Sequence, residues 1–315
     1  MSDPTSVVHH PVLSDRVLEM FCPLCDKVLL DGTVGLGGHA EVLLEANDSV
    51  RVIGIDRDAD ALAVASQRLE RFGSRFQPVH GNYRDVAQHL CDLQIGSVDG
   101  LLLDLGVSSL QLDTAERGFS FRRDGPLDMR MDRMSTQTAA AWIRDATMDE
   151  ITDVLHRYGE EKYARRIARA IVAERQADAI TSTARLAEIV RRAVPADYDH
   201  RRLDPATRTF QAIRIQVNDE LRAIEHGLSA GFDRLACGGV LVVISFHSLE
   251  DRIVKRFFRN KARACVCPPE LPECMCDKEV EARILTRRPE TASEEEVAAN
   301  PRSRSAKLRA ATRLC

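Results

Sequence analysis

The sequence lacks three features that would narrow its class: a long apolar run, a secretory leader and a strong net charge. No apolar run reaches the roughly 20 residues that a membrane-spanning helix needs. The N-terminus, Met-Ser-Asp-Pro-Thr-Ser, has neither the basic nor the apolar region of a signal peptide. We therefore expect a cytoplasmic protein with no membrane partner. Its 315 residues suffice for one large domain or two ordinary ones.

Charge is small over the whole chain but uneven along it. The net charge is −4, so the chain as a whole has no general attraction for polyanions. Residues 157–222 nevertheless carry 14 Lys and Arg against 10 Asp and Glu, and nearly all of these cations are Arg. A guanidinium group can donate two hydrogen bonds to one phosphate. The segment is either a solvated helix surface or a contact region for nucleic acid.

The nine cysteines, in a chain without a leader, are expected to be reduced. Two Cys-x-Cys pairs, Cys265 with Cys267 and Cys274 with Cys276, flank the proline-rich run 268–273. Four thiolates could hold a zinc ion, but structural zinc sites usually have at least two residues inside each pair. We therefore expect no metal and reduced thiols in a rigid loop.

Strands and helices alternate along the first third of the chain, as in a parallel sheet covered by helices. Continuous Leu, Val and Ile runs indicate strands that are buried on both faces. The predicted strands are 28–31, 50–56, 76–81, 98–104, 238–245, 282–287 and 307–314. Apolar residues at helical spacing predict helices at 13–21, 40–46, 60–72, 138–144, 148–158, 162–175, 183–193, 209–228 and 249–259.

The alternation stops after residue 112 and leaves room for an insertion. Residues 113–135 predict a long polar loop, and residues 136–226 show helical patterns with almost no strand signal. The sheet pattern then resumes. We expect a discontinuous α/β domain of residues 1–112 and 227–315, with a loop and a helical domain inserted at 113–226.

Residues 29–39, Leu-Leu-Asp-Gly-Thr-Val-Gly-Leu-Gly-Gly-His, are the most informative segment. A short strand ends in Asp31, four glycines follow within seven positions, and a helix begins. Such a turn lets a ligand approach the backbone and points N–H groups at it. It is the usual position of a nucleotide-like cofactor at the edge of a parallel sheet. Glycine-rich turns also occur with no ligand, so residues further along the chain must show whether this turn binds a cofactor.

Two further strand ends suit an adenosine. Asp56 ends the second predicted strand, where an acid accepts hydrogen bonds from both ribose hydroxyls; capping the next helix is its alternative role. Tyr83 follows the third strand and could lie against adenine, or simply pack in the core. These features suit NAD and S-adenosylmethionine alike. The two strands after the last helix favour S-adenosylmethionine, because methyltransferase sheets typically end in such a hairpin.

Nine motifs are distributed over essentially the whole chain. They are His10-Pro-Val-Leu, Asp31-Gly-Thr-Val-Gly-Leu-Gly-Gly-His39, Asp104-Leu-Gly-Val-Ser-Ser-Leu-Gln-Leu-Asp113, Arg117-Gly-Phe-Ser-Phe, Asp128-Met-Arg-Met-Asp132, Arg208-Thr-Phe-Gln-Ala-Ile-Arg-Ile, Asn218-Asp-Glu-Leu, Ile244-Ser-Phe-His-Ser-Leu-Glu-Asp251 and Asn300-Pro-Arg-Ser-Arg-Ser-Ala-Lys-Leu-Arg309. Together they closely resemble the bacterial small-subunit ribosomal RNA cytosine-N4 methyltransferases of the MraW type.

The resemblance implies a fold, a reaction and a set of site residues. The fold would be a seven-stranded Rossmann-like S-adenosylmethionine-dependent methyltransferase sheet with an inserted helical substrate-recognition domain. The substrate would be the N4 atom of a cytosine in the decoding region of 16S ribosomal RNA, so the partner is the small ribosomal subunit. Whether the chain forms a homodimer stays open. The implied cofactor-binding residues are Gly37, Gly38 and His39 at the methionine part, Asp56 at the ribose, Tyr83 at the adenine, and Asp104 with Gln111.

Methyl transfer to cytosine N4 requires that the amine be aligned with the methyl group and that acceptors bind the amine hydrogens. Other amino-methyltransferases have Asp/Asn-Pro-Pro-aromatic after the fourth strand, and this chain has Asp104-Leu-Gly-Val instead. Asp104 or an adjacent carbonyl could accept from the amine, or Asp104 could only orient the cofactor. His247 could take up the released proton, or be a packed histidine hydrogen-bonded to backbone.

A set of polar residues is expected to contact the RNA. Four of them recur at helical spacing and form one face, and the fifth follows the strand after the insertion; they are Arg208, Gln211, Arg214, Asn218 and Ser245. An interdomain hydrogen-bond network is the alternative for the helical four. Two other functions compete with a methyltransferase: an RNA-binding assembly factor without activity, and a nicotinamide-dependent oxidoreductase.

Overall fold

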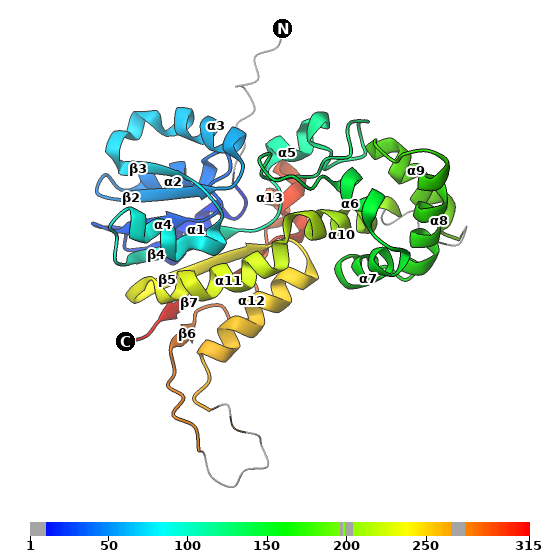
Figure 1. Ribbon diagram of the computed structural model, residues 1–315. Coiled ribbons are helices and arrows are strands. Elements are labelled where there is room, and N and C mark those ends of the chain that lie inside the picture. Colours follow the sequence, from blue (N-terminus) through cyan, green and yellow to red (C-terminus); the bar gives the residue numbers. More distant parts are fainter. Residues whose placement is uncertain (1–10, 196–197, 199–203, 266, 268–274) are drawn as a thin grey trace. The chain divides into compact units, whose positions relative to one another are not determined.

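The computed structural model describes residues 11–195, 198, 204–265, 267 and 275–315. The chain divides into two compact units (Figure 1). Unit 1 comprises Met1–Gly106 and Leu221–Cys315, and unit 2 comprises Val107–Glu220. Both divisions fall slightly before the boundaries at 112 and 226 that the sequence pattern predicts.

A seven-stranded sheet runs through unit 1 in the order β3-β2-β1-β4-β5-β7-β6 (Figure 1). The strands are β1 (Val28–Asp31), β2 (Arg51–Asp56), β3 (Phe76–His80), β4 (Val98–Asp104), β5 (Leu235–Ser245), β6 (Ala282–Ile284) and β7 (Lys307–Arg313). Strands β1 to β5 are parallel to one another, and β7 runs antiparallel to both β5 and β6. Every strand predicted from the sequence is therefore present.

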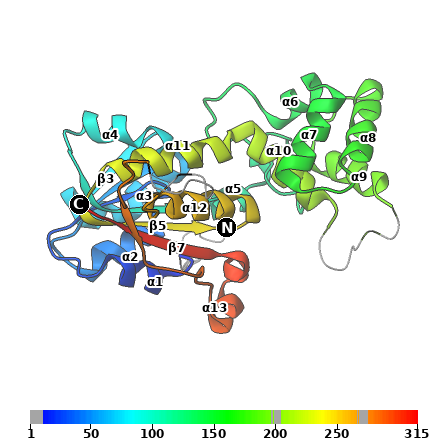
Figure 2. The same cartoon turned by 90° about the horizontal axis from the view of Figure 1, so that it is seen from below.

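Helices cover both faces of this sheet. One face carries α1 (Ser14–Phe21), α2 (Gly38–Ala46) and α3 (Ala59–Leu69). The other carries α4 (Val86–Asp92), α11 (Glu220–Asp233) and α12 (Ser248–Lys261). Figure 2 shows the strands between α1 and α2 on one side and α4 and α11 on the other. Phe21 is fully buried in the first layer, and Phe232 and Phe258 in the second. Burial on both faces explains the uninterrupted apolar runs of the central strands.

The topology concentrates polar groups at one edge. Because β1 to β5 are parallel, their carboxyl ends lie along the same edge of the sheet. The strand order reverses between β1 and β4, since the chain proceeds outward in one direction through β2 and β3 and later in the other through β5. Ligands of open α/β sheets bind at such a switch point. This edge is where the site of unit 1 is expected.

Unit 2 is helical and has a core of its own. Its helices are α5 (Ser109–Asp113), η3 (Ala115–Arg117), α6 (Ala139–Asp145), α7 (Met148–Gly159), α8 (Ala164–Ala177), α9 (Thr183–Ala193) and α10 (Ala206–Asn218). Trp142, Ile151 and Phe210 are among the buried residues of this core. No helix in the described part of the chain combines the length and apolar composition that a bilayer crossing needs.

The predicted helices differ from the observed ones in several places, and the sequence pattern missed α4, α5 and α13. The single helix predicted over 209–228 is two helices, because Asp219 adopts a left-handed conformation (φ 49°) between α10 and α11. The helix predicted over 60–72 ends at Leu69 and continues as the 3-10 helix η1 (Glu70–Arg75). The connection before β7 contains α13 (Glu294–Ala299) and the 3-10 helix η4 (Pro301–Ser305).

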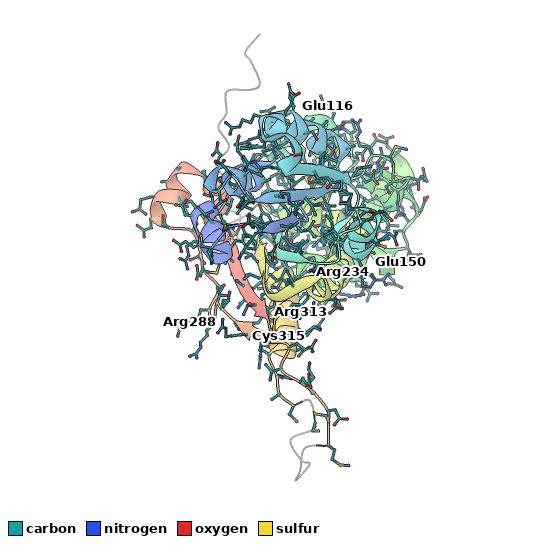
Figure 3. All side chains as sticks on the ribbon, turned by 90° about the vertical axis from the view of Figure 1, so that its left-hand side faces the viewer. Glu116, Glu150, Arg234, Arg288, Arg313 and Cys315 are labelled. Carbon is teal, nitrogen blue, oxygen red and sulfur yellow. A yellow bond between two sulfur atoms is a disulfide. The ribbon has the colours of Figure 1, made fainter. Side chains whose placement is uncertain are left out.

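The expectation that every thiol is reduced is also wrong at one pair. Cys237 and Cys315 form a disulfide with a Cα–Cα distance of 5.2 Å, inside the range that disulfides require. The two residues meet because β7 returns antiparallel to β5. Arg313, labelled with Cys315 in Figure 3, donates to the carbonyl oxygens of Asp233 (2.7 Å) and Leu235 (2.6 Å) and holds this end of the chain. A separation of 78 residues hides such a pairing from the sequence.

Candidate functional site

The glycine turn after β1 leaves the first N–H groups of α2 without a capping side chain. Gly37 has φ 84° and is the N-cap of α2, with no side chain capping the helix. A Cβ atom at this position would also lie 3.1 Å from a methyl carbon of Leu69. The N–H groups at the start of α2 therefore point outward with the positive end of the helix dipole behind them. This arrangement suits a carboxylate or a phosphate.

Three side chains meet where β1, β4 and α2 come together. Asp31 ends β1 and is 1% exposed, and its Oδ1 accepts from the N–H of Thr33 (3.1 Å). His39, buried in the first turn of α2, has its Nε2 3.5 Å from Oδ2 of Asp104 at the end of β4. The N–H of Asp104 donates to the hydroxyl of Thr33 (2.6 Å), which ties β4 to the turn. The buried Oδ1 of Asp104 has no hydrogen-bond partner among the described residues.

Burial and mutual charge perturb this cluster strongly. Burial raises the pKa of Asp31 to about 7, against a lowering effect of the nearby His39. Burial alone would lower the pKa of His39, but the hydrogen bond and the charge of Asp104 outweigh it and raise this pKa. Near neutral pH the carboxyl group of Asp31 is therefore still partly protonated, whereas an isolated carboxyl group would have lost its proton. A cation bound beside it would favour the ionised carboxylates.

Asp56 has the geometry expected of a residue that both shapes the turn and meets a ligand. Its Oδ2 accepts from the N–H of Gly35 (2.7 Å), and its Oδ1 accepts from the N–H of Asp58 (2.8 Å). Burial raises its pKa to about 6, although these two backbone hydrogen bonds lower it. The alternative role as a helix cap belongs to Asp58, whose side chain accepts from the N–H of Asp60. Each carboxylate oxygen of Asp56 retains a lone pair that the two backbone bonds leave available.

Tyr83 is more enclosed than the sequence suggests. A Cβ atom at Gly227 in α11 would lie 2.5 Å from its ring, and one at Gly32 would lie 3.1 Å from its Cβ. The ring is half-buried and packs with the apolar core on that face of the sheet. The structure thus supports the packing role that the sequence leaves as an alternative, and contact with adenine stays a prediction.

The residues at this edge fit S-adenosylmethionine. The uncapped start of α2 can receive the carboxylate of its methionine part, and Asp56 can accept from ribose hydroxyls. The carboxyl groups of Asp31 and Asp104 lie where the positive sulfonium would be, and a bound cation favours the ionised carboxylate. Buried polar atoms normally have a hydrogen-bond partner. The buried Oδ1 of Asp104 has none in the described part of the chain, which a bound ligand at this edge would explain.

Ser245 and His247, at and after the end of β5, bond to neighbouring protein groups. Ser245 is buried, and its hydroxyl donates to the carbonyl oxygen of Lys307 in β7 (3.4 Å). His247 is the N-cap of α12: its Nδ1 accepts from the N–H of Glu250, and its Nε2 is 3.0 Å from Oε1 of Glu250. This is the geometry of a packed histidine, one of the two roles that the sequence leaves open. RNA contact by Ser245 and proton uptake by His247 stay predictions.

The polar face of α10 is directed to neighbours within unit 2. Arg214 pairs with Glu220 through two contacts of 2.8 and 2.9 Å. Gln211 donates to the carbonyl oxygen of Tyr158 (3.0 Å), and Arg208 donates to that of Glu160 (2.9 Å). These bonds attach α10 to the end of α7. They correspond to the network alternative, although inside one unit instead of between two, and leave RNA contact a prediction.

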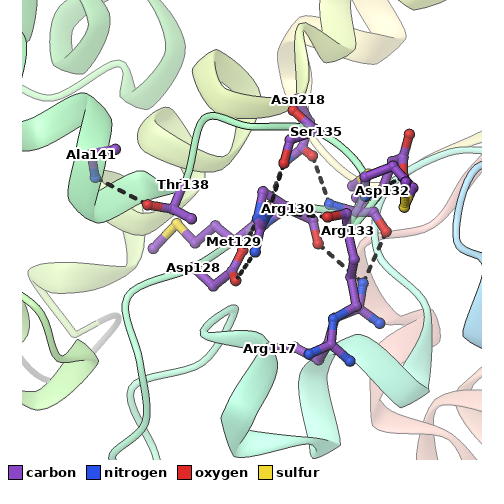
Figure 4. Close-up of polar contacts among 12 residues, drawn as sticks. Arg117, Asp128, Met129, Arg130, Asp132, Arg133, Ser135, Thr138, Ala141 and Asn218 are labelled. Atoms are coloured by element: carbon purple, nitrogen blue, oxygen red, sulfur yellow. Dashed lines mark hydrogen bonds and ion pairs between the residues drawn. The ribbon is translucent and has the colours of Figure 1, made fainter.

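Asn218 has a structural role that sequence reasoning missed. Its buried side chain accepts from the N–H of Met131 (2.8 Å) and donates to the carbonyl oxygens of Met129 (2.7 Å) and Arg214 (2.9 Å). Figure 4 shows Asn218 beside the segment that contains Met129 and Arg130. The buried Arg117 donates to the carbonyl oxygens of Arg130 and Met131. Residues 117–135, predicted as a polar loop, are therefore held by buried side chains. The sequence motifs in this segment indicated that it matters, but they did not indicate which residues its side chains contact.

Gln111 and Gly118, two motif residues of unit 2, have local structural roles. Gln111 is buried and forms a capping box with Ser108 at the start of α5: each side chain bonds the other residue's backbone N–H. Gly118 has φ 71°, and a Cβ there would lie 2.3 Å from the carbonyl oxygen of Pro126, so glycine is required. Cofactor contact by Gln111 stays a prediction. Of the four cysteines in the two Cys-x-Cys pairs, Cys274 lies outside the described residues.

Comparison with known proteins agrees with this geometry. Residues 6–314 match the model of the MraW methylase family. The chain is 52% identical over 307 residues to "Ribosomal RNA small subunit methyltransferase H" of Trichlorobacter lovleyi, covering 97% of this chain and 98% of that relative. The relative of the same name from Geobacter sulfurreducens is also 52% identical, over 97% of this chain and 99% of its own length.

A solved structure described as a putative rRNA-methylase from Clostridium thermocellum has a TM-score of 0.46 and 9% identity, and covers 98% of this chain and 100% of that one. The family match, which spans both units, and the observed strand order confirm the predicted fold class of unit 1. They also confirm the predicted family resemblance. The chain belongs to the MraW methylase family and uses S-adenosylmethionine as its methyl donor.

Proposed function

We propose that this chain transfers a methyl group to the exocyclic N4 of a cytosine in the decoding region of 16S ribosomal RNA. Whole-length relatives named as small-subunit ribosomal RNA methyltransferases support ribosomal RNA as the substrate class. Cytosine N4 and the decoding region rest on the motif resemblance and on the chemistry argued below. The partner is then the small ribosomal subunit.

Cytosine N4 is a poor nucleophile because its lone pair is delocalised into the ring. When bound, S-adenosylmethionine supplies a methyl group already activated on a sulfonium. The protein must align the amine with that methyl group and draw the lone pair back onto nitrogen. An acceptor on an amine hydrogen does this, because it favours a pyramidal nitrogen aimed at the methyl carbon.

The unpartnered Oδ1 of Asp104 is the observation that carries the proposal. Asp104 ends β4 at the switch point, its backbone is tied to Thr33, and His39 lies 3.5 Å from its other oxygen. One oxygen is thus oriented by the protein while the other remains available to accept from the amine. After transfer the nitrogen carries one proton too many, and the carboxylate of Asp104 can receive it.

Cofactor binding is assigned to residues around the glycine turn. Gly37, Gly38 and His39 bind the methionine part: the N–H groups of Gly38 and His39 donate to its carboxylate, while Gly37, whose N–H donates to the carbonyl oxygen of Val34 (2.8 Å), shapes the turn. Asp56 binds the ribose. The same proposal includes a contact of Tyr83 with the adenine, and it includes Gln111 among the residues that complete the cofactor pocket. Calorimetric titration with S-adenosylmethionine and with NAD separates this assignment from an oxidoreductase, since we expect binding of the first alone.

Exposed cations of unit 2 are better candidates for RNA contact than the polar face of α10. Four exposed cations lie just before α8 or in its first two turns: Lys162, Arg165, Arg166 and Arg169. In the described part of the chain, none of them has an ion pair or a hydrogen bond from its side chain. Cations without carboxylate partners remain available for phosphate oxygens. A cytosine must also leave its stack to be methylated, so backbone contacts that hold the flanking RNA are required.

The decisive experiment incubates the protein with labelled S-adenosylmethionine and small ribosomal subunits, followed by nucleoside analysis. We expect N4-methylated cytidine, and its absence would overturn the substrate assignment. Asp104→Asn should slow transfer at least 100-fold with a modest change in cofactor affinity. Asp92→Asn, on the exposed surface of α4, is the matched control. Full turnover by Asp104→Asn with normal cofactor affinity would exclude Asp104 as the acceptor.

The RNA surface has its own test. Arg165→Glu with Arg169→Glu should weaken subunit binding and reduce the dependence of affinity on salt, because fewer phosphate contacts release fewer counterions. Arg144→Glu is the control, since Arg144 is also exposed but paired with Asp145. Unchanged affinity and salt dependence in the double variant would remove this surface from the proposal.

A further inference from the structure

In the described part of the connection between α12 and β6, no residue belongs to an apolar core cluster. Its base is closed by the N–H of Glu281, which donates to the carbonyl oxygen of Lys261 (2.9 Å). Beyond that base, Met275 is 82% exposed and Val280 is 41% exposed. Figure 1 shows the described ends of this connection leading away from the sheet. Long connections without secondary structure are usually functional, or need some other means of being held.

Three thiols from opposite sides of this connection converge. The Sγ atoms of Cys265, Cys267 and Cys276 all lie within 4.8 Å of one another. The Sγ atoms of Cys265 and Cys276 are 3.8 Å apart. Zinc binds thiolates at about 2.3 Å, so two ligands at the tetrahedral angle have sulfurs about 3.8 Å apart. The spacing of Cys265 and Cys276 is that of two ligands in a tetrahedral thiolate site, and Cys267 lies near enough to be a third.

Backbone groups support the same arrangement. The N–H of Cys267 donates to the Sγ of Cys265 (3.3 Å), and the N–H of Met275 donates to the Sγ of Cys267 (3.4 Å). A donor on sulfur stabilises the thiolate, which is the form that binds metal. Such outer contacts also orient the ligands of a metal site.

We propose that Cys265, Cys267 and Cys276 bind one zinc ion that fastens the two sides of this connection. The short spacing within a Cys-x-Cys pair favours reduced thiols when the sequence is considered alone. The fold changes that preference, because Cys276 approaches the other two from the far side of the connection. A disulfide between Cys265 and Cys276 would use two thiols and leave the convergence of Cys267 without a reason. Soft thiolate ligands select zinc over magnesium or calcium.

The test measures metal in the full-length protein, purified under reducing conditions from zinc-supplemented medium. Elemental analysis should find about one zinc per chain, and Co²⁺ exchanged into the site should give the absorption of tetrahedral thiolate coordination. Cys267→Ser with Cys276→Ser should reduce the zinc content at least tenfold. Cys91→Ser, an exposed thiol on α4, is the matched control and should retain the metal.

A second measurement keeps the proposal open to refutation if a variant folds poorly. Chelation of the wild-type protein should increase proteolytic cleavage within residues 262–281, and added zinc should reverse the increase. Zinc content below about one tenth per chain after reconstitution would overturn the proposal. So would equal zinc content in the double variant and the control, or a Cys265–Cys276 disulfide in protein prepared under reducing conditions.

Discussion

Replacing Asp31 by Asn should stabilise the cofactor-free protein at alkaline pH while weakening cofactor binding. Asp31 is 1% exposed at the end of β1, and its Oδ1 accepts from the N–H of Thr33. An asparagine Oδ1 can accept the same hydrogen bond. The substitution therefore removes a buried charge and keeps the local geometry.

The magnitude follows from the pKa. Burial raises the pKa of Asp31 from 3.8 to about 7 in the folded protein. The folded state therefore holds a proton that the unfolded state has lost between these values, and stability falls as pH rises through this window. Each pKa unit is about 1.4 kcal/mol, so ionisation of Asp31 costs about 4 kcal/mol of unfolding free energy by pH 8. Asp31→Asn should recover a large part of this cost.

Urea unfolding between pH 5 and pH 8 measures the effect. Asp31→Asn should gain about 2 kcal/mol over the wild type near pH 5 and about 4 kcal/mol at pH 8, with a flatter pH dependence. Asp92→Asn, which removes an exposed carboxylate, controls for net charge. Parallel pH profiles for wild type and Asp31→Asn, or a loss of stability at pH 8 in the variant, would refute the reasoning.

Three further outcomes follow from the geometry. Gly37→Ala should lose about 1–2 kcal/mol in thermal unfolding, because alanine is strained at φ 84°, and should bind S-adenosylmethionine more weakly; wild-type values for both would contradict the turn geometry. Asn218→Ala should lose about 3 kcal/mol, since three buried backbone partners lose their bonds; a loss under 1 kcal/mol would argue against the network. Because burial raises the pKa of Asp56 to about 6, the Kd for S-adenosylmethionine should rise about tenfold from pH 7 to pH 5. In Asp56→Asn that rise should shrink, and an unaltered pH profile would separate Asp56 from cofactor binding.

Much of unit 1 could be predicted from residue patterns alone. Strands buried on both faces must be apolar throughout, and helices between them must be amphipathic, so the strand positions are visible in the sequence. Parallel strands bring their carboxyl ends to one edge, which is why Asp31, Asp56 and Asp104 could be grouped in advance. The turn at Gly37 is equally visible, because few residues other than glycine adopt its backbone conformation.

Contacts between distant segments could not be predicted in this way. The face of α10 has polar residues at helical spacing whether they meet RNA or a neighbouring helix, and only packing distinguishes the two. Asn218 bonds the backbone around Met129 and Met131, and a backbone partner leaves no trace in sequence. The break at Asp219 was hidden because a left-handed residue between two helices has no strict sequence requirement.

The sequence by itself determined the sheet, the glycine turn and the family, because each depends on local backbone geometry or on a pattern repeated along the chain. The tertiary structure alone decided the protonation of Asp31, the disulfide of Cys237 with Cys315 and the convergence of Cys265, Cys267 and Cys276. Burial and distance between remote residues govern these properties, and both come into existence only when the chain is folded.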